Sequence, residues 1–154
     1  MEALVKVPTL DDAIAFAVLK YAEHKPDKGG APYVLHPLRV MLAMDTDEER
    51  RVAVLHDVIE DCQVTPDELL ALGYPAKEVE AVVALSRRED EGESYEQFIQ
   101  RLRPNALARK VKLADIEHNM DIRRLAVVDE RARERLDRYL QAWKVLQGDA
   151  GHAP

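Results

Sequence analysis

Apolar residues recur at helical spacing along most of the chain, and short polar segments separate these stretches. The pattern predicts helices over about 10–24, 37–44, 47–62, 66–72, 75–85, 95–103, 106–121 and 130–146. No stretch alternates apolar and polar residues as a strand would. We therefore predict an all-α fold of seven or eight helices, forming a single domain over residues 1–154 with its core at about 9–147 and a disordered tail at 148–154.

Residues that favour helix ends mark several of these boundaries. Residues able to cap a helix N-terminus precede five predicted helices: Thr9, Thr65, Ser94, Asn105 and Asp129. Pro37 is expected at the first position of its helix, which places His36 at or near the N-cap. Gly73 is expected to end a helix, and residues 88–94 form a polar, mobile loop in this prediction.

The stretch AVLHDVIED at residues 53–61 stands out within the predicted helix 47–62. Val52, Leu55, Ile59 and Cys62 form its apolar stripe. A separate arc carries one histidine and three acids, His56, Asp57, Glu60 and Asp61, with no Lys or Arg among them. A divalent cation would relieve this repulsion, and His56 with Asp57 would supply two of its ligands. The alternative is a solvated acidic face beside a partly buried histidine.

Composition narrows the function without deciding it. The chain has 154 residues, 47% of them hydrophobic and 33% charged, with a net charge of −7. This acidity argues against nucleic acid or an anionic membrane surface as the main partner, although local cations still permit an anionic substrate. The single Cys62 suits a reducing compartment, and the chain shows neither a membrane-spanning run nor a signal-peptide pattern, so we expect a cytoplasmic protein.

Two further predicted helices carry candidate metal ligands. His36 and Asp115, together with the pair His56-Asp57, make four ligands from three helices, and Asn119 lies one turn beyond Asp115. The alternatives are that His36 only caps its helix and that Asp115 and Asn119 form a solvated helix edge. His118 is expected to pack or to support a ligand, and His24 to lie at a helix end near the mouth of the site.

Three sequence blocks, KGGAPYVLHPLRV, LHDVIED and KLADIEHNM, place these residues in the order His … His-Asp … Asp. In this order the chain resembles the HD-domain metal-dependent phosphohydrolases, and in particular the hydrolase domain of the RelA/SpoT family, which degrades guanosine tetra- and pentaphosphate. The resemblance covers about residues 21–121. It implies an enzyme that hydrolyses a phosphate ester or pyrophosphate of a nucleotide, with the 3′-pyrophosphate of guanosine tetraphosphate as the favoured substrate.

The resemblance also implies roles for individual residues. His36, His56, Asp57 and Asp115 would bind a divalent metal, which is generally Mn²⁺ in the family. The acidic pair Glu60 and Asp61 would be catalytic, in agreement with its place about one turn beyond the ligands, where it can hold a water or take its proton. The substrate would contact a set made of Lys28, Gly29, Gly30, Tyr33 and Asn119. The alternative for Lys28-Gly29-Gly30 is an ordinary turn.

The chain departs from the family pattern at three places, one of which is Lys25-Pro26 in place of the family's upstream Gly-Gln. Asp27-Lys28 stands where alarmone hydrolases usually have Arg-Lys, so an acid replaces the cation that helps to hold the guanine. The chain also ends before a synthetase domain could fit, so only hydrolysis is expected.

Two other functions stay open. The same chemistry could act on another small phosphorylated metabolite, as Asp27 would favour. A regulatory module could instead keep the metal and bind nucleotide without turnover. The oligomeric state is also open, since the charge-rich final helix suits self-association or a protein partner. Lys112, Arg109, Arg123 and Arg124 are the basic residues that we consider for the site.

Overall fold

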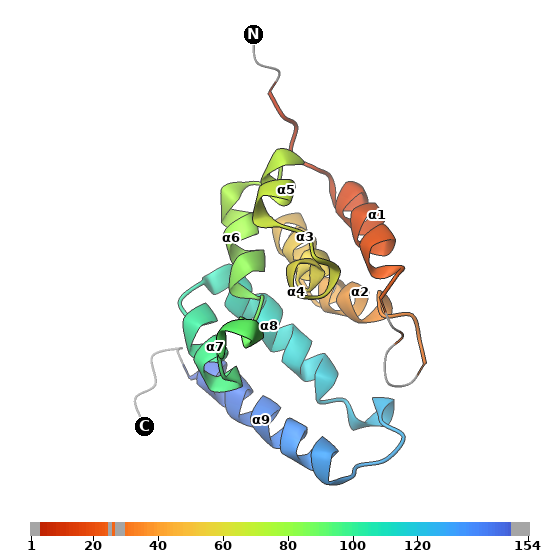
Figure 1. Cartoon of the computed structure of the whole chain (residues 1–154), viewed down its shortest axis with the longest axis vertical. Helices are drawn as coiled ribbons and strands as arrows, with labels where there is room; N and C mark the ends of the chain where they lie inside the picture. Colours follow the sequence, from red (N-terminus) through yellow and green to blue (C-terminus); the bar gives the residue numbers. More distant parts are fainter. Residues whose placement is uncertain (1–3, 25, 27–29, 149–154) are drawn as a thin grey trace.

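The structure, a computed structural model, describes residues 4–24, 26 and 30–148, and within these ranges it contains helices and no strand (Figure 1). The helices of the first part are α1 Leu10–Tyr21, α2 Leu35–Leu42, α3 Asp47–Leu55, α4 Val58–Cys62, α5 Pro66–Ala71 and α6 Ala76–Ala84. Those of the second part are α7 Tyr95–Leu102, α8 Ala106–Asn119 and α9 Glu130–Gln147, with short 3₁₀ turns η1 Glu89–Glu91 and η2 Ile122–Arg124. The all-α prediction is confirmed.

Side-chain caps fix the helix starts that the sequence predicts. The five predicted N-caps, Thr9, Thr65, Ser94, Asn105 and Asp129, each accept a hydrogen bond from the backbone N–H three residues later. Such a bond satisfies one of the N–H groups that a helix start leaves without a partner. Gly73 also ends its segment as expected, with φ +98°, and a Cβ there would lie 2.7 Å from the Lys6 carbonyl oxygen.

Three local predictions need correction. The helix expected over 47–62 is split into α3 and α4 at His56–Asp57. Pro37, expected at the first position of its helix, is the third residue of α2, because Tyr33 O accepts a bond from His36 N and the helix already starts at Leu35. His36 is therefore near the N-cap and not at it. Residues 88–94, expected as a plain loop, contain the 3₁₀ turn η1 and are tied to α7, because Arg101 donates two hydrogen bonds to the Glu93 carboxylate, at 2.7 and 2.9 Å.

Helix α8 joins two hydrophobic cores. Its Ala108 and Val111 belong to the larger core, which α1 to α6 build around buried residues of α3 such as Val54. Ile116 of the same helix belongs to the smaller core with α7 and α9. Figure 1 shows α8 between these groups, with α9 alongside it. Side chains of α8 that lie between these two cores therefore contact residues from both.

No helix within the described ranges is long and apolar enough to cross a membrane. Two residues of the predicted site, Lys28 and Gly29, lie outside the described residues, and so does Asp27. Of the predicted tail, only Gly148 is described. Gly30 is described and has φ +82°, a left-handed conformation that favours glycine.

Candidate metal centre and phosphate pocket

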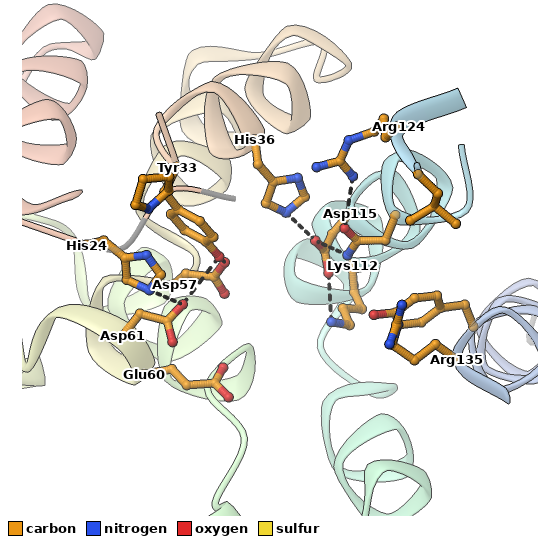
Figure 2. A pocket seen from close by; sticks show the side chains of 14 residues that line it. His24, Tyr33, His36, Asp57, Glu60, Asp61, Lys112, Asp115, Arg124 and Arg135 are labelled. Carbon is orange, nitrogen blue, oxygen red and sulfur yellow. Dashed lines mark hydrogen bonds and ion pairs between the residues drawn. The ribbon is translucent and has the colours of Figure 1, made fainter. Parts of the chain in front are cut away.

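Three helical elements bring together the side chains that the sequence singles out. His36 comes from α2, His56 follows the last turn of α3, and Asp115 comes from α8 (Figure 2). His36 Nε2 lies 2.7 Å from Asp115 Oδ1, and His56 Nε2 lies 3.6 Å from the same oxygen. One ligand atom from each residue lies within 4.8 Å of the others, and all three residues are buried. This spacing suits a metal ion between them.

The environment of His56 provides a physical test of whether a cation fits. Its Nδ1 lies 2.7 Å from the Ala53 carbonyl oxygen and therefore donates to it. Its Nε2 is buried, has no hydrogen-bond partner among the described residues, and faces the carboxylates of Asp57, at 3.1 Å, and Asp115. Burial disfavours a charge on His56, yet these two carboxylates raise its pKa well above the usual value. A proton or a metal cation has to offset their charge, and the donor set suits a divalent metal.

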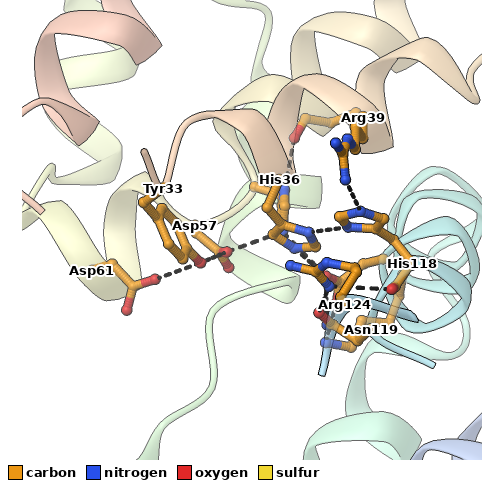
Figure 3. Close-up of polar contacts among 12 residues, drawn as sticks. Tyr33, His36, Arg39, Asp57, Asp61, His118, Asn119 and Arg124 are labelled. Carbon is orange, nitrogen blue, oxygen red and sulfur yellow. Dashed lines mark hydrogen bonds and ion pairs between the residues drawn. The ribbon is translucent and has the colours of Figure 1, made fainter. Parts of the chain in front are cut away.

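Asp57 is the fourth predicted ligand and is placed differently from the other three. Its carboxylate lies beside His56 Nε2 but is not part of the cluster of mutually close ligand atoms formed by His36, His56 and Asp115. The Tyr33 hydroxyl donates to Asp57 Oδ2 at 2.6 Å and lies 3.3 Å from Asp61 Oδ2 (Figure 3). Tyr33, expected from the sequence to contact substrate, is thus engaged with the acids of the site itself.

A second histidine supports the first ligand. His118 stacks on His36 with ring centroids 4.9 Å apart, and their Nδ1 atoms are separated by 2.6 Å. Because Arg39 can only donate to His118 Nε2, His118 donates from Nδ1 to His36, which then donates from Nε2 to Asp115. Burial, and then the charge of Arg124, lower the pKa of His118 to about 4, so its ring is neutral. The supporting role expected of His118 fits this geometry. A cation bound to His36 Nε2 would displace the proton there, and the neutral His36 would then carry its proton on Nδ1 and donate it to His118.

Two acids line the open side of the pocket. Partial burial, and then the charges of Asp57 and Asp61, raise the pKa of Glu60 to about 7. The pKa of Asp61 is also raised, by burial and by Asp57. His24 lies at this mouth as expected, with its ring packed at a tilt against Tyr33 and its Nε2 4.0 Å from Asp61 Oδ2. A carboxyl group whose pKa is close to neutrality can both take and release a proton near pH 7.

Basic side chains line the opposite wall (Figure 2). Lys112 of α8 donates to Asp115 Oδ2 at 2.7 Å and lies over the rings of Phe98 and Tyr95. Burial opposes its charge, but Asp115 raises its pKa above the usual value, so Lys112 stays protonated. Arg124 bonds to the Asn119 side-chain oxygen, at 3.3 Å, while Asn119 donates to Asp115.

Two of the four basic candidates do not reach the pocket. Arg109 donates to the Arg103 carbonyl oxygen, and Arg123 pairs with Asp121 while its side chain is 87% exposed. Sequence analysis missed two other lining residues, Arg135 and Tyr139 of α9. Their spacing of four places them on one helix face, a signal that could have found them.

The resulting pocket has a volume of about 450 Å³, within the range of small-molecule sites. Carboxylates line one side and cations the other, with the His36, His56 and Asp115 cluster between them. An anionic group can therefore approach the basic wall while a metal offsets the acids.

An all-α domain with a His on one helix, a His-Asp pair at a helix break and an Asp on a third helix has the arrangement of an HD-type domain, the class that the sequence predicts. No family model matches the chain. The chain is 34% identical over 110 residues to the guanosine-3′,5′-bis(diphosphate) 3′-pyrophosphohydrolase of Vibrio cholerae, a match that covers 64% of this chain and 16% of that protein. It is 33% identical over 139 residues to GTP pyrophosphokinase rsh of Brucella ovis, covering 82% of this chain and 18% of that protein.

A solved structure agrees with the fold. The chain in the structure titled "A metazoan ortholog of SpoT hydrolyzes ppGpp and plays a role in starvation responses" matches with a TM-score of 0.69 at 18% identity, covering 92% of this chain and 87% of that one. These matches confirm the resemblance to RelA/SpoT-type hydrolase domains. The chain spans less than a fifth of the length of the curated relatives, 16% of one and 18% of the other.

Proposed function

We propose that this protein is a metal-dependent phosphohydrolase that cleaves a pyrophosphate of a nucleotide. The observation that carries the proposal is the buried cluster of His36, His56 and Asp115, whose ligand atoms lie within 4.8 Å of one another. In the part of the chain that the structure describes, His56 Nε2 has no hydrogen-bond partner. A buried nitrogen without a partner among carboxylates is costly unless a cation occupies the space beside it.

His36, His56 and Asp115 would hold the metal, with Asp57 as the fourth ligand beside His56. Two imidazoles and two carboxylates suit a borderline divalent ion, and we propose Mn²⁺. When bound, the metal would lower the pKa of a water and polarise a phosphoryl oxygen. Lys112 supports this ligand set because its ammonium group is bonded to Asp115 and offsets part of the negative charge.

Glu60 and Asp61 would handle the proton. Both line the pocket on the open side, and the pKa of Glu60 is about 7, so its carboxylate can accept a proton from a water at neutral pH. Tyr33 holds Asp61 near Asp57 through its hydroxyl. The proton acceptors therefore lie next to the metal ligands but on the side that the solvent reaches.

Lys112, Arg124 and Arg135 would bind the phosphates, because they form the wall opposite the acids. Asn119 would offer its side chain to the substrate from the same wall, and Lys28, Gly29 and Gly30 are proposed to contact the substrate as well. The substrate we favour is guanosine tetraphosphate, cleaved at its 3′-pyrophosphate. The support is the printed name of the Vibrio cholerae relative, a guanosine-3′,5′-bis(diphosphate) 3′-pyrophosphohydrolase.

The test is pyrophosphate release from guanosine tetraphosphate by the purified chain, with and without Mn²⁺, beside a panel of nucleotides and the Asp57→Ala variant. Metal-dependent release from the tetraphosphate, lost in Asp57→Ala, supports the proposal in full. Release only from other compounds keeps the chemistry and changes the substrate, as Asp27 would favour. Binding of nucleotide with no release from any compound would contradict an enzymatic role and favour a regulatory module.

A cytoplasmic location is part of this proposal, supported by the single cysteine of the chain. The proposed substrate is a small nucleotide rather than nucleic acid or a membrane, in keeping with the net charge of −7.

A further inference from the structure

The break between α3 and α4 changes the hydrogen bonding of Asp57. In a continuous helix the Asp57 N–H would donate to the carbonyl oxygen of Ala53. Here His56 occupies that oxygen, with its backbone N at 3.3 Å and its Nδ1 at 2.7 Å. The Asp57 N–H donates instead to the hydroxyl oxygen of Tyr21, at 3.1 Å. A residue of α1 therefore supplies the partner that the helix break removes.

A second tyrosine holds the side chain of the same residue. The Tyr33 hydroxyl donates to Asp57 Oδ2 at 2.6 Å, a short bond of the kind a carboxylate accepts from a hydroxyl. The same hydroxyl oxygen lies 3.3 Å from Asp61 Oδ2, so it bridges the metal-ligand candidate and the acid on the open side (Figure 3). Asp57 is thus hydrogen-bonded to Tyr21 through its backbone N–H and to Tyr33 through its carboxylate.

Both tyrosines are rigidly placed. Tyr21 is only 2% exposed and belongs to the larger core. Tyr33 packs its ring against Tyr21 at 5.4 Å, His24 at 4.1 Å and His36 at 6.1 Å between ring centroids. Tyr33 therefore touches the residues on both sides of the site, and its hydroxyl has little freedom to turn toward a substrate without releasing Asp57.

We propose that Tyr21 and Tyr33 are positioning residues that together aim the Asp57 carboxylate at His56 Nε2, with Tyr33 also setting the place of Asp61. The inference rests on the proposed metal site. It differs from the expectation that Tyr33 contacts substrate, because it assigns the hydroxyl to the ligand set. Partners that orient a metal ligand typically change metal affinity or activity by about 10- to 100-fold when they are removed.

The test uses Tyr33→Phe and Tyr21→Phe, which remove one hydroxyl each and keep the rings that pack. Tyr74→Phe is the matched control, because Tyr74 is 4% exposed in the same core but lines a separate cavity with Phe16. Mn²⁺ affinity is measured by calorimetry on each metal-free protein, and thermal unfolding verifies that each variant folds. Tyr33→Phe should weaken Mn²⁺ binding about 10-fold. It should also lower kcat for the best substrate about 10-fold and leave KM unchanged.

A metal-free measurement makes the inference independent of turnover. Hydrogen exchange of the Asp57 amide in the absence of metal should be about fivefold faster in Tyr21→Phe than in the wild type, because the variant loses the acceptor. The control variant should exchange as the wild type does at this amide.

The outcomes separate the inference from the proposed function. Wild-type protein that binds no Mn²⁺ would contradict the metal site, while the amide exchange would still report on Tyr21. Wild-type Mn²⁺ affinity in Tyr33→Phe would overturn the role of Tyr33 even if the enzyme is active. A raised KM in Tyr33→Phe, with kcat and Mn²⁺ affinity unchanged, would show that Tyr33 contacts the substrate instead. Unchanged amide exchange in Tyr21→Phe would overturn the role of Tyr21.

Discussion

The two sides of the pocket differ in how firmly their side chains are held. On the ligand side the side chains of His36, His56 and Asp115 are 7%, 1% and 5% exposed, and each has partners from another helix or turn. On the acid side, Glu60 and Asp61 project from the short helix α4 toward the opening, and Asp61 is 30% exposed. A metal site requires fixed ligands, whereas groups that exchange protons with water and substrate require access. The fold separates these two requirements across a distance of one helical turn.

Tyr33 joins the two sides. Its hydroxyl contacts Asp57, next to the ligand cluster, and Asp61, at the opening. Because the ligands lie on one side and the acids that exchange protons on the other, variants on the ligand side should weaken metal binding, and variants on the acid side should slow turnover.

The largest effect is expected on the ligand side. Asp115→Asn keeps the shape of the side chain but removes the charge that Lys112, His36 and His56 surround. We expect Mn²⁺ affinity to fall by more than about 100-fold and hydrolysis to fall with it, because a direct ligand matters more than its supporting partners. Calorimetry and the pyrophosphate-release assay measure the two losses.

Asp121→Asn is the control for this variant, since Asp121 pairs with Arg123 outside the pocket. It should bind Mn²⁺ as the wild type does. Wild-type Mn²⁺ affinity in Asp115→Asn would contradict the assignment of the ligand side.

The next effect is expected on the acid side. Glu60→Gln should lower kcat about 100-fold, the scale of a lost general base, while Mn²⁺ affinity stays within about threefold of the wild type. Glu80→Gln, an exposed glutamate on α6, is the control and should leave both quantities unchanged. Should Glu60→Gln weaken Mn²⁺ binding as strongly as Asp115→Asn, the separation between the two sides would be wrong.

Acid should weaken metal binding in a defined direction. The pKa of His56 is raised well above its usual value, so the metal-free protein holds a proton there that a cation must displace. Below that pKa, Mn²⁺ affinity should fall about tenfold for each pH unit per displaced proton. Calorimetry at pH 6, 7 and 8 measures the trend, and buffers of different ionisation enthalpy count the released protons. Affinity that is constant over this range would contradict the account of His56.

The smallest effect is expected for an ion pair outside the pocket, which should change the stability of the fold but neither metal binding nor turnover. Hydrogen bonds from Arg101 lower the pKa of Glu93 from 4.5 to about 2, so the ion pair stabilises the fold above about pH 4.5 and this contribution disappears as the pH falls toward about 2. Glu93→Gln should cost about 1 kcal/mol of unfolding free energy at pH 7, less than the pKa shift alone implies because the solvent screens the pair.

Urea unfolding at pH 7 and pH 2.5 compares the wild type with this variant. The difference should shrink at the lower pH, while Mn²⁺ affinity at pH 7 is unchanged. A difference that persists at pH 2.5 would show that Glu93 acts through packing rather than through its charge.

The sequence predicts much of this structure because its signals are local. Thr65, Ser94 and Asn105 cap their helices through bonds that span three residues, and such bonds are visible as short motifs. The candidates His36, His56 and Asp115 also meet as expected. Their order along the chain resembles that of the HD-domain phosphohydrolases, and this resemblance is what predicted that they lie together.

Long-range contacts account for what was missed. At the helix break the Asp57 N–H bonds to Tyr21, which lies 36 residues earlier, and apolar periodicity continues through the break. Arg135 enters the pocket because α9 packs beside α8, a fact that the charge pattern of α9 does not reveal. The bond from the Tyr33 hydroxyl to Asp57, 24 residues later, is likewise a long-range contact that the sequence pattern does not show, while substrate contact by Tyr33 stays a prediction.

The most direct test of the central claim is anomalous X-ray diffraction from crystals grown with Mn²⁺, recorded at the manganese absorption edge. The account predicts one strong peak between His36 Nε2, His56 Nε2 and the Asp115 carboxylate, and no such peak in crystals of Asp115→Asn. A wild-type crystal with no peak among these three side chains, or with its peak elsewhere, would contradict the claim that this buried cluster is the metal centre.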